Sequence, residues 1–194
     1  QSHVQVLTIQ GGNRNALGLQ ARQRGLQADQ IVAGDIGFVL GPRLNAAGRL
    51  ASALAALDLL TTQDVAKAAQ LAQQLDNQNR ERQQITREIQ AHAEQLALAD
   101  DPQALLLIAV DASYNPGGVG LAASRLVEQY YRPAIVAYQG DEFTRASCRS
   151  IPEFHITAAL DETAELLVQH GGHAAAAGFT VRNEHLPELI YRLR

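Results

Sequence analysis

Two short, uninterrupted apolar runs stand out in the second half of the chain. They cover residues 104–110 and 134–138, and a helical stretch from Val119 to Tyr130 separates them. A continuous apolar run of strand length is typical of a strand buried on both faces of a sheet. Strand, helix and strand in about 35 residues match the size of a βαβ unit, which closes right-handed. The pattern therefore predicts a parallel strand pair.

The remaining pattern extends this α/β unit toward the C-terminus. Residues 144–150 predict a further strand, and residues 178–181 predict a last short strand. Residues 156–170 predict a helix, and a closing helix is expected from about Glu184. We therefore expect an α/β fold in residues 101–194.

A single long helix is predicted over residues 61–100. Thr62 is a candidate N-cap, and Asp64 favours the first turn through its negative charge. Apolar and small residues then recur at the three- and four-residue spacing of one helical stripe. Polar Asn79 and Arg82 interrupt this stripe, so we expect the helix to bridge two bodies and to cross solvent or a cleft. A coiled-coil dimer is the alternative, which the broken heptad pattern disfavours.

The first 60 residues have the weakest periodicity. Val4–Ile9 alternates as a short strand does. Gly41-Pro42 is expected to punctuate the chain, and an Ala- and Leu-rich helix is expected from after Gly48 to about Leu60.

Composition narrows the class of protein. The hydrophobic fraction of 46% and the charged fraction of 19% are those of a globular chain. The net charge of −4 argues against a strongly basic nucleic-acid binder, although all the cations except Lys67 are arginines, whose planar fork suits phosphates. The single Cys148 is compatible with a reducing cytoplasm. The absence of methionine leads us to expect a fragment, and no apolar run approaches the roughly 20 residues that span a membrane.

Ser147 and Arg149 are candidate phosphate ligands. The two-residue period of a strand places them on one face and Cys148 on the other. A solvated strand face with a salt-bridged arginine is the alternative. Cys148 has no evident base beside it, so it is predicted to be a core residue rather than a nucleophile.

Two glycine-containing segments are further candidates. The loop around Asn115 lies between a buried strand and a helix, where α/β sheets bind ligands and helix N-termini attract anions. A plain tight turn explains this loop equally well. Arg43 and Arg49 flank a Gly- and Ala-rich turn that a phosphate backbone could approach. They could instead cap helices or pair with Asp58.

Gly171, Gly172 and His173 precede four alanines. Glycines permit close approach of a backbone to another group, and a histidine there could donate a hydrogen bond to a phosphate. A helix C-cap after His170 is the alternative, because glycine is favoured just past a helix end. His170 and His173 have ligand-like spacing but no accompanying cysteine or carboxylate, so no metal site is predicted in this chain.

Four motifs together resemble one family. They are residues 40–50 (LGPRLNAAGRL), 117–126 (GGVGLAASRL), 147–150 (SCRS) and the stretch that begins at Gly171. Their order and spacing are similar to those of RecJ-type single-strand-specific exonucleases of the DHH/DHHA1 phosphoesterase superfamily, over about residues 35–194.

The resemblance implies a division of the chain and a set of DNA contacts. Residues 1–60 would be the incomplete end of a DHH-type domain, residues 61–100 a long connecting helix, and residues 101–194 a DHHA1-like α/β domain with a mixed, partly parallel sheet. Single-stranded DNA would lie in a cleft. Its phosphates would be bound by Arg43, Arg49, Asn115, Ser147, Arg149, Gly171, Gly172 and His173, the last also in a supporting catalytic role.

The resemblance also implies a metal site outside this chain. The family holds two divalent ions, Mn²⁺ or Mg²⁺, through aspartates and a His-His pair. No Asp-His-His and no Asp-x-Asp sequence occurs here, so the fragment alone is expected to hold no cofactor and to be inactive. Tyr114-Asn115 stands where the family often has Trp-His, which puts a proton-transfer role there in doubt.

The function implied is part of a single-stranded-DNA-specific 5′-to-3′ exonuclease of DNA repair and recombination. Its expected partners are single-stranded DNA and the missing DHH catalytic domain, with no membrane, in the cytoplasm. One alternative is a DHH-family hydrolase of short oligoribonucleotides or small phosphorylated substrates. Another is a non-catalytic nucleic-acid-binding module.

Overall fold

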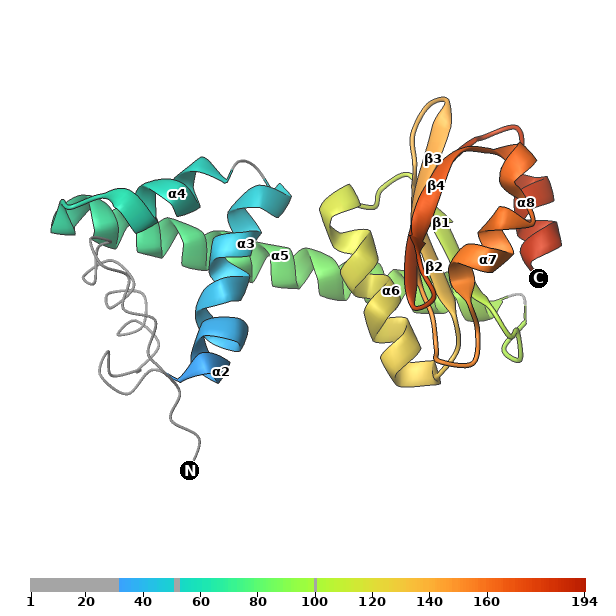
Figure 1. Ribbon diagram of the computed structural model, residues 1–194, viewed down its shortest axis with the longest axis horizontal. Helices are drawn as coiled ribbons and strands as arrows, with labels where there is room; N and C mark the ends of the chain where they lie inside the picture. The colour runs from blue at the N-terminus through green and yellow to red at the C-terminus, as the bar shows by residue number, and fades with distance from the viewer. Residues whose placement is uncertain (1–31, 51–52, 100) are drawn as a thin grey trace. The chain divides into compact units, whose positions relative to one another are not determined.

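The computed structural model describes residues 32–50, 53–99 and 101–194 (Figure 1). The chain divides into two compact units, residues 1–82 and residues 83–194. The long helix α5 (Val65–Ala99) contributes residues to both units, so the predicted helix is confirmed. The strand predicted at Val4–Ile9 lies outside the described residues.

The second unit is built on one mixed sheet. Its strands are β1 (Leu107–Asp111), β2 (Ala134–Gln139), β3 (Phe143–Arg149), β4 (Leu167–His173) and β5 (Ala176–Arg182). The strand order is β1-β2-β3-β5-β4. Only β1 and β2 are parallel, and the other neighbours are antiparallel. The predicted α/β fold with a partly parallel sheet is therefore confirmed.

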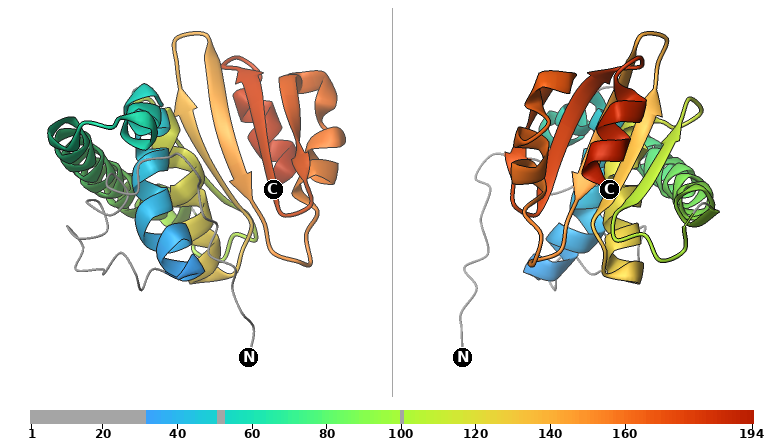
Figure 2. Two further views of the ribbon diagram at one scale, coloured as in Figure 1. Left: turned by 60° about the vertical axis from the view of Figure 1, so that its left-hand side comes forward. Right: turned by 90° about the vertical axis from the view of Figure 1, so that its right-hand side faces the viewer.

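Helices cover both faces of this sheet (Figures 1 and 2). Helix α6 (Pro116–Tyr130) and the second half of α5 bury one core against β1 and β2. Helices α7 (Ile156–Asp161) and α8 (Leu186–Leu193) bury a second core on the opposite face, with a short 3₁₀ turn between α7 and β4. Cys148 belongs to this second core, and burial raises the pKa of its thiol to about 12, so the prediction of a core residue is confirmed.

Local chemistry sets the ends of α6. The side chain of Asn115 accepts a hydrogen bond from the backbone N–H of Gly117 at 2.8 Å, which caps one of the free donors of the first turn. Pro116 follows at a position where its missing N–H costs nothing. The helix ends at Tyr131, which adopts a left-handed conformation with φ of 51°.

The helix predicted for residues 156–170 is wrong. Helix α7 ends at Asp161, and residues 167–173 form strand β4 instead. Tertiary pairing overrides the helical preference of the Leu- and Ala-rich sequence, because β4 completes the sheet by pairing with β5. Gly171 and Gly172 therefore lie inside a strand, and the alternative of a helix C-cap is also wrong.

The described part of the first unit is helical. It contains α2 (Ala33–Asp35), a π-helical turn η1 (Ile36–Leu40), α3 (Gly41–Leu50), α4 (Leu54–Thr61) and the first half of α5. The predicted punctuation at Gly41-Pro42 is wrong, because the chain stays helical through both residues. The wider π-helical turn ends at Leu40, two residues before Pro42, whose nitrogen lacks the N–H of a regular helix. The helix expected from after Gly48 to Leu60 is divided between α3 and α4.

Asp64 rather than Thr62 caps α5. Its carboxylate accepts hydrogen bonds from the backbone N–H groups of Ala66 at 2.8 Å and Lys67 at 3.2 Å. Thr62 instead accepts from the N–H of Asp64, one step before the helix. The N-cap of α5 is therefore Asp64, two residues after the predicted Thr62.

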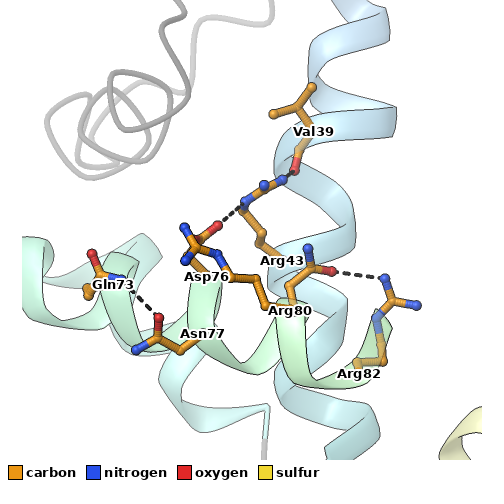
Figure 3. Close-up of polar contacts among 8 residues, drawn as sticks. Val39, Arg43, Gln73, Asp76, Asn77, Arg80 and Arg82 are labelled. Atoms are coloured by element: carbon orange, nitrogen blue, oxygen red, sulfur yellow. Dashed lines mark hydrogen bonds and ion pairs between the residues drawn. The ribbon is translucent and has the colours of Figure 1, made fainter. Parts of the chain in front are cut away.

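A buried ion pair joins α3 to α5 (Figure 3). Nε of Arg43 lies 2.8 Å from Oδ1 of Asp76, and its guanidinium also donates to the carbonyl of Val39. Arg80 contacts the second oxygen of Asp76 at 2.9 Å from the helix surface. In the described part of the unit, small and leucine side chains of α4 and α5 form an apolar cluster. Arg43 therefore holds the helices together and does not pair with Asp58, which contacts Lys67.

The polar middle of α5 contains a buried polar residue, Asn79. Asn79 is only 1% exposed, and its side-chain oxygen accepts a hydrogen bond from Arg82 at 2.9 Å (Figure 3). The neighbouring Arg80, Glu81, Gln83 and Gln84 are exposed, so the predicted crossing of solvent or a cleft stays a prediction, and Asn79 is a buried residue within it.

We expect Arg43→Met to loosen α3 strongly. The change removes the buried cation that pairs with Asp76, and among the described ion pairs of this carboxylate only the one with the exposed Arg80 remains. Breaking a buried pair in this way costs about 3–5 kcal/mol of stability. Hydrogen exchange of the α3 amides should accelerate by roughly a hundredfold or more. Arg80→Ala is the control and should change exchange by less than about tenfold, because exposed pairs contribute about 0–1 kcal/mol. Equal effects of the two variants would contradict the role of Arg43.

We also expect Tyr114→Phe to leave the second unit at least as stable as before. Tyr114 is 3% exposed, and no described residue forms a hydrogen bond with its hydroxyl. Burial and the charge of Asp111 raise its pKa to about 12. Removing an unsatisfied buried hydroxyl should raise the free energy of unfolding by roughly 0–1 kcal/mol in urea titrations. A loss of about 1 kcal/mol or more would show that the hydroxyl has a partner.

Candidate nucleic-acid interface

The pairing of β3, β5 and β4 creates three polar rows on one face of the sheet. Directly opposed residues of antiparallel strands point to the same face. The rows are Arg145–Thr180–Gln169, Ser147–Gly178–Gly171 and Arg149–Ala176–His173. We call these residues the trough. The trough residues of the middle strand, β5, have small side chains or none, and the larger polar side chains of the trough belong to β3 and β4.

The trough is open along β4. Gly171 and His173 are exposed, and a Cβ added to Gly171 would meet no atom within 4 Å. A hollow of about 450 Å³ occupies one end. It is lined by Arg145, Ala146, Gln169, His170, Gly171, Gly178, Phe179 and Thr180. With strands about 4.8 Å apart, the distance from β3 to β4 is about 10 Å, so the trough suits one extended chain.

Helix α6 closes the β3 side of the trough. A Cβ added to Gly120 would lie 3.2 Å from Nη2 of Arg149 and 3.4 Å from Oγ of Ser147. Nη1 of Arg149 donates to the carbonyl of Cys148 at 2.8 Å, which orients the guanidinium. The other donors of its fork make no hydrogen bond within the described part of the chain. Arg149 and Ser147 can therefore both offer donors to one anion.

The turn between β4 and β5 positions His173. Thr157 donates through its hydroxyl to the carbonyl of His173 at 2.8 Å, and the N–H groups of Ile156 and Ser150 donate to the carbonyls of Ala174 and Ala175. Nδ1 of His173 accepts from the N–H of Ala175 at 3.3 Å. The neutral imidazole therefore carries its proton on Nε2 and can donate it to an acceptor from the exposed side.

A carboxylate limits the anion-binding area on this face. Asp111 ends β1 in the row that continues through Tyr138 to Arg145. Hydrogen bonds from the hydroxyl and N–H of Ser113 hold the pKa of Asp111 below its usual range, so it is ionised at neutral pH. A polyanion is repelled at the β1 end and attracted on the side of β3 and β4.

The structure brings together only some of the residues predicted from the sequence. Ser147, Arg149, Gly171 and His173 share the trough, as the two-residue period predicted for the first pair. Gly172 points to the opposite face. The remaining predicted residues lie elsewhere: Arg43 is buried in the first unit, the side-chain oxygen of Asn115 caps α6, and the side chain of Arg49 is outside the described residues.

Three polar residues of the trough were missed by the sequence analysis. Arg145 continues the alternation of Ser147 and Arg149, so its position on the same face was predictable from β3 alone. Thr180 and Gln169 were not predictable, because β4 was expected to be helical and the register across β5 was unknown.

The described residues offer no donor set for a divalent ion. In residues 32–50, 53–99 and 101–194, no three His, Cys, Asp or Glu side chains gather as metal ligands do. Across the same ranges, no helix is long and apolar enough to cross a membrane.

A family model and several characterised proteins are similar to this chain. The family model of the DHHA1 domain matches residues 103–194. The single-stranded-DNA-specific exonuclease RecJ of Bacillus subtilis is 38% identical over 160 residues, which are 81% of this chain and 20% of that protein. The RecJ of Dickeya dadantii is 39% identical over 174 residues, 85% of this chain and 30% of that protein. The chain thus spans less than a third of these relatives.

A solved structure shares the fold. RecJ of Thermus thermophilus in complex with Mn²⁺ superposes with a TM-score of 0.81 at 32% identity, over 92% of this chain and 26% of that one. A structure of RecJ from the same organism is in complex with Mg²⁺.

We expect Gly172→Ala to destabilise the second unit by about 2–3 kcal/mol. The φ of Gly172 is 154°, and an added Cβ would lie 2.3 Å from the carbonyl oxygen of Ala176 and 2.5 Å from Cα of Ala177. These are backbone atoms, so the strand pairing itself must shift. All the tyrosines lie in this unit, so their fluorescence in urea titrations reports its unfolding.

Gly171→Ala is the matched control for this glycine. It should change the free energy of unfolding by less than about 0.5 kcal/mol, because its Cβ would enter open space. An equal loss in both variants would mean that the strand tolerates no side chain at either position.

Proposed function

We propose that this chain is part of a single-stranded-DNA-specific exonuclease and binds the DNA in its trough, because residues 103–194 match the family model of the DHHA1 domain. The intact enzyme would act from the 5′ end in DNA repair and recombination, in the cytoplasm. The likeness to RecJ proteins over more than four fifths of the chain supports this proposal.

The observation that carries the proposal is the arrangement of donors along β3. Arg149 and Ser147 stand two residues apart on one open face, about 7 Å along the strand. Both offer hydrogen-bond donors, and the guanidinium can bind a phosphate with two parallel N–H bonds. Such contacts bind the sugar-phosphate backbone without reading the base sequence.

The rest of the trough favours a single strand. Gly178 and Ala176 leave room for a chain over β5, and Gly171 removes bulk from β4. His173 can add an Nε2–H donor to a phosphate from the β4 side. We assign it this binding role, which supports the reaction without a proton transfer of its own.

Arg43 and Asn115 have no direct role in this proposal. The guanidinium of Arg43 is bound to Asp76, and the side-chain oxygen of Asn115 is bound to Gly117. The Mn²⁺ or Mg²⁺ ions of the intact enzyme would be held by another part of that protein. They would activate the water that attacks the phosphodiester, so this chain contributes DNA binding only.

We expect the 194-residue chain to bind labelled oligo(dT) at low salt, and Arg149→Ala to weaken binding about tenfold. The loss should be equal for oligo(dC), because a phosphate contact is independent of sequence. The slope of log K against log salt concentration should fall by about 0.7, the value for one phosphate of a single strand. Fluorescence anisotropy across a salt series measures both quantities.

Arg125→Ala is the matched control. Arg125 lies on the exposed surface of α6 and pairs with Glu128, so the variant loses the same charge away from the trough. It should bind as the unaltered chain does. Equal weakening by both variants, or no binding to single strands at low salt, would contradict the proposal.

A further inference from the structure

The hollow at one end of the trough carries hydrogen-bond acceptors as well as donors. It is lined on one side by Arg145 and on the other by Gln169, with Thr180 between them in the same row. An amide and a hydroxyl supply acceptors as well as donors. A phosphate, which only accepts, would use the donors of this set and leave its acceptors unused. A nucleobase edge, which carries both donors and acceptors, matches this set.

The shape of the hollow fits a flat group. Gly171 and Gly178 oppose each other on adjacent strands and form a floor without side chains. A volume of about 450 Å³ lies in the range of small-ligand clefts, about 300–1,000 Å³. A planar ring can therefore lie against the floor while its edge meets the Gln169–Thr180 row.

The next row along the strands adds a stacking platform. Phe143 opposes Arg182 beyond the row of Arg145, and the guanidinium carbon of Arg182 lies 5.2 Å from the centre of the Phe143 ring. Arginine planes and aromatic rings are the groups on which proteins stack bases of single strands. Such a platform beside the hollow favours a base over a second phosphate.

We propose that this hollow is a nucleobase subsite, in which Gln169 and Thr180 hydrogen-bond the edge of a base. The inference deepens the function proposed above and rests on it for the placement of a single strand in the trough. Arg145, which lines the hollow on the β3 side, lies about 7 Å, or two residues, from Ser147 along β3. A nucleotide whose phosphate lies at Ser147 and Arg149 can place its base, or that of its neighbour, in the hollow.

Isolated nucleotides test the subsite without a DNA strand. ¹⁵N-labelled chain is titrated with dAMP and, separately, with 2-deoxyribose 5-phosphate, which carries the phosphate but no base. We expect dAMP alone to shift the backbone amides of Gln169, Gly171 and Thr180. Both ligands should shift the amides around Ser147 and Arg149. Identical shifts from the two ligands, or none near Gln169 at millimolar dAMP, would overturn the subsite.

Two variants then separate base contact from structure. Gln169→Ala and Thr180→Val should each weaken dAMP about fivefold or more, the effect of losing a base contact, and leave the sugar phosphate unchanged. Gln95→Ala, an exposed glutamine of α5, is the control and should change neither affinity. Equal weakening of both ligands by Gln169→Ala would assign that residue to the phosphate and refute the subsite.

The outcomes distinguish this inference from the function on which it rests. If dAMP binds in the hollow but single strands do not bind the chain, the proposed DNA function fails and the subsite stands. If oligo(dT) binds through Arg149 but dAMP shifts map outside the hollow, the DNA function stands and the subsite fails.

Discussion

The antiparallel pairing of β5 between β3 and β4 is the constraint on which the second unit depends. It places Phe179 and Val181 in the core with α7 and α8, and it places Gly178 and Thr180 on the opposite, open face. The pairing needs glycine at two positions. A Cβ added to Gly178 would lie 3.2 Å from the carbonyl oxygen of Ala146, and a Cβ added to Gly172 would lie closer still to backbone atoms of β5. One register thus defines both the core and the trough.

The same register explains how an acidic chain can offer a face to a polyanion. The net charge is −4, yet Arg145, Arg149 and Arg182 stand on one face of β3 and β5. Local charge and donor geometry determine a phosphate contact, because exposed charges more than about 8–10 Å apart are largely screened at physiological salt. Total charge therefore says little about this site.

The two units are stabilised by different interactions. Apolar side chains on both faces of a sheet stabilise the second unit. In the described part of the first, a small apolar cluster is accompanied by the buried pair of Arg43 and Asp76, which has a defined geometry and gains little net stability over an apolar equivalent. A buried ion pair chiefly specifies which helices meet, so Arg43 is better understood as an orienting residue of α3 than as a DNA contact.

The sequence alone was sufficient wherever one local pattern dominates. The apolar runs predicted β1 and β2, the alternation around Cys148 predicted that Ser147 and Arg149 share a face, and the helical stripe on either side of Asn79 predicted α5. Each of these follows from a side-chain period within one element. The same two-residue period would also have placed Arg145 on the face of Ser147 and Arg149.

The tertiary structure decided what depends on contacts between distant segments. Residues 167–173 have helix-forming neighbours but form a strand, because β5 offers them a ladder of backbone hydrogen bonds. Arg43 was a plausible phosphate ligand until Asp76, a distant residue in the sequence, proved to bind it. Gln169 and Thr180 meet only through the register of β4 on β5. Periodicity determines which face of an element a residue occupies, whereas pairing and packing between elements determine what that face meets.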